Sequence, residues 1–345
     1  MKKIVKAGLS ALLVSQVALT GVANAQETAN IVQVSQQTQF KTEKIDGLDI
    51  FYREAGSKSK PTLLLLHGFP TSSHMFRNLI PKLSEKYHVI APDYPGYGNS
   101  SMPSVLEFDY TFDNMSGIVQ KLLTKLSIDK YSMYVMDYGA PVGFSIAASN
   151  PKSIQSLIIQ NGNAYAEGLD NDFWEPIKEY WKDRKAVNKG LDNKWWKNIK
   201  AAYKQPNMTN DAALRFLLTE GATKWQFLNG IRNKEAISPD NWHGTQRLLD
   251  RPGNAEIQLK MFHDYGTNPP LYSSWQAYFR KHQPNTLIVW GTKDEIFPEA
   301  GAHPYKRDLK NLEFHLFDTG HFALEEDGVE IAKLIGRFLK SGPKK

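Results

Sequence analysis

The stretch VMDYGA at residues 135–140 decides the fold. It closes the apolar, β-forming run Tyr131–Met136, and small residues follow at once at Gly139 and Ala140. This pattern predicts a buried strand that turns sharply into a helix, with Asp137 at the apex of the turn. The turn would present Asp137 at the carboxyl edge of a sheet. Asp137 is then either a nucleophile or merely the N-cap of the helix, because aspartate is a favoured N-cap residue.

Further apolar runs surround this one, and helical patterns separate them. The expected strands are Leu48–Arg53, Thr62–Leu66, Tyr87–Ala91, Tyr131–Met136, Ser156–Gln160, Thr286–Trp290 and Leu312–Phe317. Runs that are apolar on both faces are typical of parallel strands covered by helices on each side. The sequence therefore predicts an α/β fold with a mostly parallel, doubly wound sheet. Residues 26–39 are polar and are expected to form a flexible lead-in.

The alternation stops between residues 165 and 265, where no strand pattern occurs and tryptophan is frequent. The segment is too long for a connecting loop, so we expect an inserted helical cap. The core then consists of residues 26–164 and 266–345. Lysines and aromatic residues alternate within 178–204, which we interpret as the solvated face of cap helices rather than a surface for a polyanion or a membrane.

The first 25 residues have the pattern of a cleaved secretory signal peptide. Lys2, Lys3 and Lys6 precede the mainly apolar run Ala7–Val22, and Ala23-Asn24-Ala25 is a small-x-small cleavage site. The apolar run is short for a membrane anchor, although an uncleaved anchor is the alternative. We expect a periplasmic or secreted protein without a stable membrane anchor.

Composition excludes several kinds of site. The chain of 345 residues has no cysteine, which rules out disulfides, thiolate metal sites and a cysteine nucleophile. Half of its net charge of +6 comes from the lysines of the signal segment, so the basic balance does not indicate a nucleic-acid partner. No H-E-x-x-H motif and no glycine-rich phosphate loop occurs. We therefore expect no metal and no cofactor.

Two further motifs follow predicted strands. His67-Gly68-Phe69-Pro70 comes directly after Thr62–Leu66, in a position where backbone N–H groups could face a developing oxyanion. Asp294 and His321 each follow a later strand. Because parallel strands end at one edge of a sheet, Asp137, Asp294 and His321 are expected to meet there. A histidine oriented by a carboxylate is the general base of hydrolytic triads.

With these motifs the chain resembles the α/β-hydrolase superfamily, in the branch of epoxide hydrolases and haloalkane dehalogenases that uses an aspartate nucleophile. The resemblance is strongest at residues 67–70, 93–98, 136–140, 290–298 and 319–325. It implies an alkyl ester on Asp137 that His321 hydrolyses with the help of Asp294. It also implies an oxyanion hole formed by the backbone N–H groups of Phe69 and Tyr138.

The leaving group separates the two activities. Haloalkane dehalogenases carry halide donors at the positions of Tyr138 and Phe69, and neither side chain supplies an indole or amide N–H. The family's epoxide hydrolases instead protonate the epoxide oxygen with cap tyrosines. We assign this role to Tyr265 and Tyr180.

Other residues remain in question around this pocket. The rival proton donors to Tyr265 and Tyr180 are Tyr272, Tyr278 and His243. His67, Trp174 and Trp181 are expected to contact a small apolar substrate, either an epoxide or an alkyl halide. The alternatives are a haloalkane dehalogenase or other hydrolase, and a secreted binding or effector protein with little turnover. The oligomeric state stays open.

Overall fold

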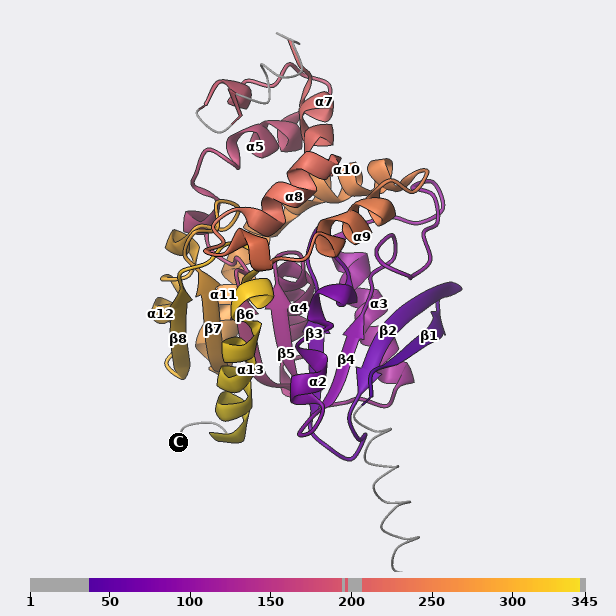
Figure 1. Ribbon diagram of the computed structural model, residues 1–345, viewed down its shortest axis with the longest axis vertical. Coiled ribbons are helices and arrows are strands. Elements are labelled where there is room, and N and C mark those ends of the chain that lie inside the picture. The colour runs from indigo at the N-terminus through magenta and orange to yellow at the C-terminus, as the bar shows by residue number, and fades with distance from the viewer. Residues whose placement is uncertain (1–36, 194–195, 198–206, 342–345) are drawn as a thin grey trace, which may run out of the picture.

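The computed structural model describes residues 37–193, 196–197 and 207–341. Its centre is a sheet of eight strands in the order β1-β2-β4-β3-β5-β6-β7-β8 (Figure 1). Strand β2 is antiparallel to both of its neighbours, and the strands from β4 to β8 are parallel. The strands are β1 (Gln39–Ile45), β2 (Leu48–Ala55), β3 (Thr62–Leu66), β4 (His88–Pro92), β5 (Tyr131–Met136), β6 (Ile154–Gln160), β7 (Asn285–Gly291) and β8 (Leu312–Phe317).

Helices cover both faces of the sheet and its carboxyl edge. They are α2 (Ile80–Leu83), α3 (Phe112–Lys125), α4 (Gly139–Ser149), α5 (Glu175–Lys182), α7 (Asn210–Arg215), α8 (Glu220–Leu228), α9 (Asp240–Leu249), α10 (Asn254–Asp264), α11 (Asn268–His282), α12 (Tyr305–Asp308) and α13 (Ala323–Ser341). No helix within the described ranges is both long enough and apolar enough to cross a membrane.

The core consists of two apolar layers, one on each face of the sheet. Successive side chains of a strand point to opposite faces. In β3, Leu64 and Leu66 therefore pack with α3, α4 and α11, whereas Leu63 and Leu65 pack with α2 and α13. Burial on both faces explains why these strands are continuously apolar, and it confirms the predicted α/β class.

One strand, β1, was not predicted from the sequence. Strand β1 pairs with β2 in antiparallel register from Gln39 opposite Glu54 to Ile45 opposite Leu48. Its sequence QFKTEKI is mostly polar, and its side chains alternate between partly buried and exposed. An edge strand with one solvated face needs few apolar residues, so its sequence shows little of the apolar pattern that predicts a strand.

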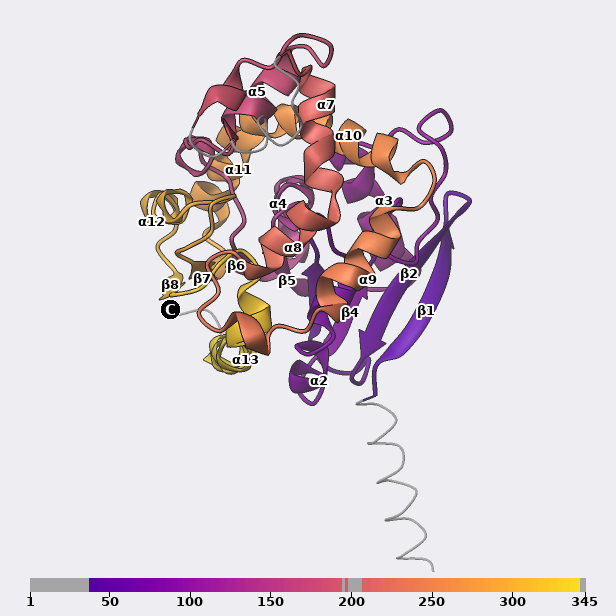
Figure 2. The same ribbon diagram turned by 45° about the horizontal axis from the view of Figure 1, so that its top comes forward.

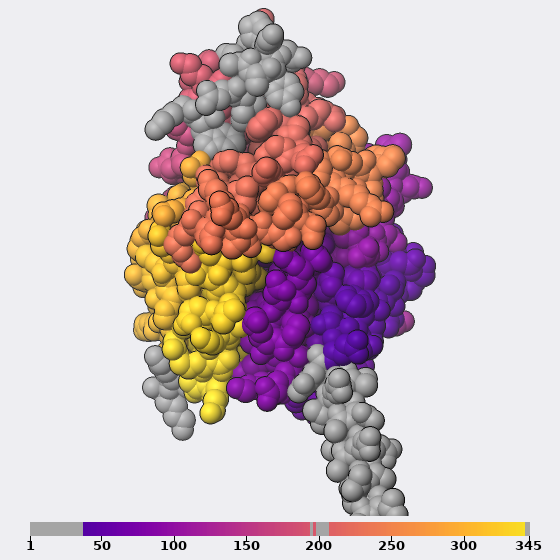
Figure 3. All heavy atoms as spheres, in the orientation of Figure 1, coloured from indigo at the N-terminus to yellow at the C-terminus, as the bar shows by residue number. Residues whose placement is uncertain are grey.

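Between β6 and β7 the chain forms helices that lie over the carboxyl edge of the sheet (Figures 1 and 2). Helices α5 and α7–α10 form this upper layer, whereas α11 packs against α4 beside the sheet. The space-filling view shows α8 and α9 lying directly over α13 and the N-terminal half of the core (Figure 3). Residues from this upper layer thus lie above the apex of the turn after β5.

Candidate active site

Asp137 lies at the turn between β5 and α4. Its φ of 51° is in the left-handed region, which residues other than glycine seldom adopt. Backbone strain of this kind is typical of functional sites. The N-cap of α4 is Tyr138, and no side chain caps this helix. The structure therefore does not support the alternative in which Asp137 serves only as a helix cap.

Glycines allow the elements around Asp137 to approach closely. A Cβ atom on Gly139 would lie 2.3 Å from the carbonyl oxygen of Leu66, so only glycine lets α4 begin against β3. A Cβ atom on Gly68 would lie 2.3 Å from the Cβ atom of Asp137. These contacts bring the loop after β3 against the turn that carries Asp137.

The two oxygens of Asp137 have different surroundings. Oδ1 accepts hydrogen bonds from the backbone N–H of Phe69 at 2.7 Å and of Tyr138 at 2.5 Å. Two backbone donors on one oxygen form an oxyanion hole. Oδ2 instead faces Nε2 of His321 across 3.7 Å. One oxygen is therefore held, and the other is free to attack.

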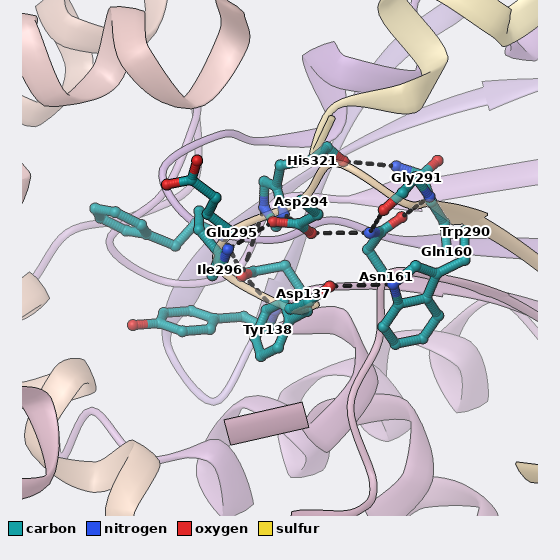
Figure 4. Close-up of polar contacts among 12 residues, drawn as sticks. Asp137, Tyr138, Gln160, Asn161, Trp290, Gly291, Asp294, Glu295, Ile296 and His321 are labelled. Carbon is teal, nitrogen blue, oxygen red and sulfur yellow. Dashed lines mark hydrogen bonds and ion pairs between the residues drawn. The ribbon is translucent and has the colours of Figure 1, made fainter. Parts of the chain in front are cut away.

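His321 is oriented from its opposite side by Asp294, as Figure 4 shows. Its Nδ1 lies 2.8 Å from Oδ2 of Asp294, which also accepts a hydrogen bond of 2.8 Å from the side-chain amide of Asn161. The backbone N–H of Ile296 donates to Oδ1 of Asp294 at 2.8 Å. This arrangement makes Nδ1 the protonated nitrogen, so Nε2 carries the lone pair. Nε2 is buried and has no hydrogen-bond partner among the residues that the structure describes.

Burial and charge shift the pKa values of this pair. Burial raises the pKa of Asp137 to about 6, although His321 and the two backbone N–H groups favour the charged form. Burial alone would lower the pKa of His321, but the carboxylates of Asp294 and Asp137 together raise it. The pKa of Asp137 is thus raised towards neutral pH and the pKa of His321 is raised above its usual value, which suits an acid–base pair in a hydrolytic site.

A small cavity of about 30 Å³ lies over Asp137, between the sheet edge and the upper helices. Its volume leaves room for only a few solvent molecules, so a bound substrate is small or displaces the lining side chains. The lining is mostly aromatic and aliphatic. It comprises Phe69, Asp137, Tyr138, Phe173, Trp174, Ile177, Leu217, Gln226, Phe262, Tyr265 and Ile296.

Tyr265 contributes a phenol to this cavity. Its ring packs on Trp174 with centroids 5.1 Å apart, and burial raises its pKa well above 10, with Tyr272 and Asp137 adding to the shift. A hydrogen bond links its hydroxyl to that of Tyr272, which also accepts one of 2.9 Å from Asn163. Tyr265 is therefore neutral over the physiological range and keeps the proton that it donates to Tyr272 in this structure. Tyr272, a rival donor, supports Tyr265 and does not line the cavity.

The structure corrects the expectation for Tyr180. Its hydroxyl donates a hydrogen bond of 2.8 Å to the backbone carbonyl of Leu259, and its ring packs against His263. Tyr180 does not line the cavity over Asp137. The last turn of α5, which carries Tyr180, packs against α10 at Leu259 and His263, and this contact, which the sequence does not reveal, directs the phenol away from the site.

Two expected substrate contacts also lie outside the cavity. His67 is fully buried, and its Nε2 accepts a hydrogen bond of 3.3 Å from the backbone N–H of Tyr94. Burial lowers the pKa of His67 to about 3, so the ring stays neutral and supports the loop after β3. Trp181 donates its indole N–H to the carbonyl of Phe262 at 2.8 Å. Trp174, by contrast, does line the cavity.

The other two rival proton donors, Tyr278 and His243, do not line the cavity. Tyr278 packs against His282, and His243 lies beside Glu220 on the surface.

Two candidate site residues were not predicted from the sequence. The first is Asn161, although a polar residue directly after the apolar strand β6 is a signal of the same kind as Asp137. Gln226 was also missed, because nothing in its local sequence distinguishes it from other glutamines.

Together the residues can perform a two-stage hydrolysis. Oδ2 of Asp137 can form an ester with a carbon atom in the cavity, and His321 can activate water against that ester. No group of three or more His, Cys, Asp or Glu side chains in the described part of the chain is arranged to hold a metal ion.

Known proteins share this arrangement of elements. The chain is 41% identical over 290 residues to the uncharacterized hydrolase YNR064C of Saccharomyces cerevisiae, covering 84% of this chain and 93% of the relative. It is 34% identical over 306 residues to Epoxide hydrolase 4 of Mus musculus, covering 86% and 78%. The crystal structure of haloalkane dehalogenase DbeA from Bradyrhizobium elkani matches with a TM-score of 0.65 at 20% identity, covering 89% of this chain and all of that one.

The family described as alpha/beta hydrolase fold matches residues 61–328. That range includes the turn of Asp137, the loop after β3, the upper helices and the loop of His321. The expected superfamily is thereby confirmed. The chain is a hydrolase that belongs to the alpha/beta hydrolase fold family.

Proposed function

We propose that this hydrolase opens small apolar epoxides to vicinal diols through a covalent ester on Asp137. The observation that carries the proposal is that the free Oδ2 of Asp137 and the phenol of Tyr265 belong to one small aromatic cavity. A carboxylate is a weak nucleophile that suits a strained, polarised C–O bond, and a neutral phenol is a suitable proton donor to the departing oxygen. The likeness to Epoxide hydrolase 4 of the mouse supports the same reading.

The first step forms the ester. Oδ2 of Asp137 attacks an epoxide carbon while Oδ1 stays on the N–H groups of Phe69 and Tyr138. The C–O bond of the ring breaks, its electron pair moves to oxygen, and that oxygen takes the proton of the Tyr265 hydroxyl. The enzyme then carries a hydroxyalkyl ester on Asp137 and a phenolate at Tyr265.

The second step hydrolyses the ester. Nε2 of His321 takes a proton from water, and the hydroxide attacks the carbonyl carbon of Asp137. The oxyanion formed there is held by the N–H groups of Phe69 and Tyr138. Collapse expels the diol oxygen, which takes the proton from His321, and the proton left on the Asp137 carboxyl returns to the Tyr265 phenolate. The sum is epoxide plus water to diol.

Dehalogenation is less well supported by the contacts of the tryptophans. A departing halide needs free N–H donors. The indole N–H of Trp174, which lines the cavity, donates to the carbonyl of Ile296 at 2.6 Å. The indole N–H of Trp181 donates to Phe262. Neither indole is available to a halide without breaking a bond to the backbone.

The test is a single turnover with terminal epoxides and haloalkanes in ¹⁸O-labelled water, with diol and halide quantified separately. The ester route transfers an oxygen of Asp137 to the first diol formed, so ¹⁸O is expected in the Asp137 peptide and not in that diol. Asp137→Ala should abolish diol formation while the protein remains folded. Halide release that depends on Asp137 would favour a dehalogenase, and neither product would favour a binding protein or another substrate.

We also propose that residues 1–25 act as a signal peptide and that the protein is periplasmic or secreted. These residues lie outside the described ranges. The lysine-rich start and the small-x-small site at 23–25 support the proposal.

A further inference from the structure

Gln226 is a buried amide without a partner. It lies on α8, is 3% exposed, and lines the cavity that also contains Asp137 and Tyr265. The structure gives its side chain no hydrogen bond to any residue that it describes. Its amide atoms nevertheless keep some accessible surface, unlike the unpaired hydroxyl of Tyr94, which is fully enclosed. The amide is therefore open to the cavity.

The other buried glutamines of the described chain all have partners. Gln160 bonds to Tyr134 and to the carbonyl of His321, and Gln258 bonds to Tyr97 and Asn254. Gln246 bonds to Thr223, Leu218 and Asp250. Buried polar groups are almost always hydrogen-bonded, and an unpaired amide costs folding free energy. Asn268 is also a buried amide without a partner, but its atoms are fully enclosed, whereas Gln226 lines the cavity. A molecule bound in the cavity can therefore be the partner of Gln226.

We propose that the side-chain N–H of Gln226 donates a hydrogen bond to the epoxide oxygen, as the second donor beside Tyr265. This inference rests on the proposed function and deepens it. It supplies the donor that Tyr180 cannot provide, since the Tyr180 hydroxyl is bonded to Leu259. During ring opening the Gln226 amide keeps its proton, and Tyr265 transfers the only proton that moves.

The geometry of the cavity makes this contact reachable. Gln226 and Tyr265 line the same cavity as Asp137. An epoxide that Oδ2 of Asp137 attacks occupies this cavity, so we expect its oxygen to meet these two polar side chains. The amide is neutral at every working pH, so its donor strength does not vary with pH. Two oriented donors stabilise the developing alkoxide in a water-poor site.

The experiment isolates ester formation. In a His321→Gln background the ester cannot be hydrolysed and accumulates, and intact-protein mass spectrometry follows its growth with a terminal epoxide. Adding Gln226→Met removes the N–H while keeping a similar volume. We expect the rate constant of ester formation to fall about 100- to 1,000-fold, as for the loss of one oxyanion donor. Gln120→Met on α3, away from the cavity, is the matched control and should not change the rate.

A second measurement distinguishes a hydrogen-bond donor from a side chain that only shapes the cavity. Loss of a donor to the departing oxygen matters less when that oxygen is a better leaving group. The effect of Gln226→Met should therefore shrink for epoxides with electron-withdrawing substituents, which a change in cavity shape would not produce. If Gln226→Met does not fold, Gln226→Asn keeps an amide on a shorter arm and should show a smaller loss with the same substituent trend.

Three results would overturn the inference. An unchanged rate of ester formation would make Gln226 a packing residue. Accumulation of ester in the single variant Gln226→Met, with His321 intact, would show that Gln226 positions the hydrolytic water instead. A loss confined to haloalkanes would assign the N–H to a halide. Failure of His321→Gln alone to form an ester with any epoxide would instead reject the proposed function itself.

Discussion

At the scale of single residues, the site depends on the different roles of two carboxylates. Asp137 is buried beside an aromatic cavity, and its Oδ2 has no hydrogen bond in the described structure. Asp294 is fully engaged by Asn161, Ile296 and His321. The first is therefore able to react, and the second can only orient and stabilise. Sequence order alone suggested this division, and the hydrogen bonds give its physical basis.

The pH dependence of turnover follows from the pKa shifts of Asp137 and His321. The pKa of Asp137 is raised to about 6, so the nucleophile becomes protonated and ester formation is lost as the pH falls through that value. The pKa of His321 is raised, so hydrolysis is lost at a somewhat higher pH. The pKa of Tyr265 lies well above 10, so no decline is expected up to about pH 9. Turnover should rise once with pH, measured as diol formation at saturating epoxide.

Between the two transitions the ester should accumulate, because Asp137 is ionised while His321 is still protonated. Rapid-quench mass spectrometry at a pH just above about 6 would detect it. Ester formation also neutralises Asp137 and removes one of the charges that raise the pKa of His321. Accumulation should therefore be partial. A bell-shaped profile, or an ester that is equally abundant at pH 9, would contradict this assignment.

Asp294→Asn should block the second step and spare the first. The asparagine amide would donate to Nδ1 of His321 and thereby place the proton on Nε2, the nitrogen that must accept one. We expect hydrolysis to fall by about 10³-fold or more while ester formation stays within a few-fold. Single-turnover kinetics separate the two rates. Equal loss of both steps would instead indicate a general disturbance of the site.

At the scale of elements, the decisive feature is how closely α4 approaches β3. The turn that carries Asp137 and the loop after β3, with the N–H groups of Phe69 and Tyr138, meet only because glycine occupies the crossing point. The motif VMDYGA is thus a packing motif, whatever part it takes in the proposed chemistry. Its glycine determines where the helix begins, and the start of the helix determines where Asp137 points.

Gly139→Ala should therefore destabilise the fold. Its Cβ atom would lie 2.3 Å from a backbone oxygen that cannot move aside. We expect the free energy of unfolding to fall by about 2–3 kcal/mol, as for other overpacked sites. Gly117→Ala on α3 is the matched control, since its Cβ atom would meet nothing within 4 Å. That variant should gain about 0.5–1 kcal/mol from helix propensity. Urea denaturation measures both, and equal stability of the two variants would refute the packing argument.

At the scale of the whole molecule, one polar cluster connects the upper helices to the core. Arg77, in the loop after β3, donates two hydrogen bonds to Glu325 of α13 at 3.1 and 2.8 Å. It also donates to the side chain of Asn241 of α9 at 2.6 Å, and Asn241 donates to Glu325 at 2.8 Å. The position of α9, and through it α8 with Gln226, therefore depends on these contacts.

Arg77→Ala should loosen this connection. Glu325 would be left largely buried without its cation, and we expect a loss of about 1–3 kcal/mol in unfolding free energy. Hydrogen exchange should become faster in α9 than in α13. Lys333→Ala removes an exposed ion pair on α13 and should change stability by less than about 0.5 kcal/mol. Uniform exchange across the protein after Arg77→Ala would argue against a local connection.

Export of the full chain is a further expected property of the whole molecule. Expression of the full chain in a Gram-negative host should yield a periplasmic protein whose N-terminal peptide begins at Gln26. Replacing Lys2, Lys3 and Lys6 by glutamate should retain the precursor. Mass spectrometry of the purified protein measures both outcomes, and an intact Met1 in the periplasmic fraction would favour an uncleaved anchor.

The sequence by itself determined the parts that local pattern encodes. Apolar runs of strand length revealed the parallel sheet, because a strand buried on both faces has no room for polar residues. Polar residues after those runs predicted that Asp137, Asp294 and His321 meet, because parallel strands end at one edge, and the structure brings the three side chains together. The partly exposed strand β1 was missed for the converse reason, since one solvated face removes the apolar signal.

Only the tertiary structure decided which cap side chains face the nucleophile. Tyr180 and Gln226 both lie on helices of the upper layer, and neither helix shows from its sequence alone which face meets the cavity. Helix packing directed the Tyr180 phenol to the carbonyl of Leu259 and left the Gln226 amide open to the cavity. The direction of a side chain depends on contacts between segments far apart in the chain, and these contacts exist only once the chain has folded.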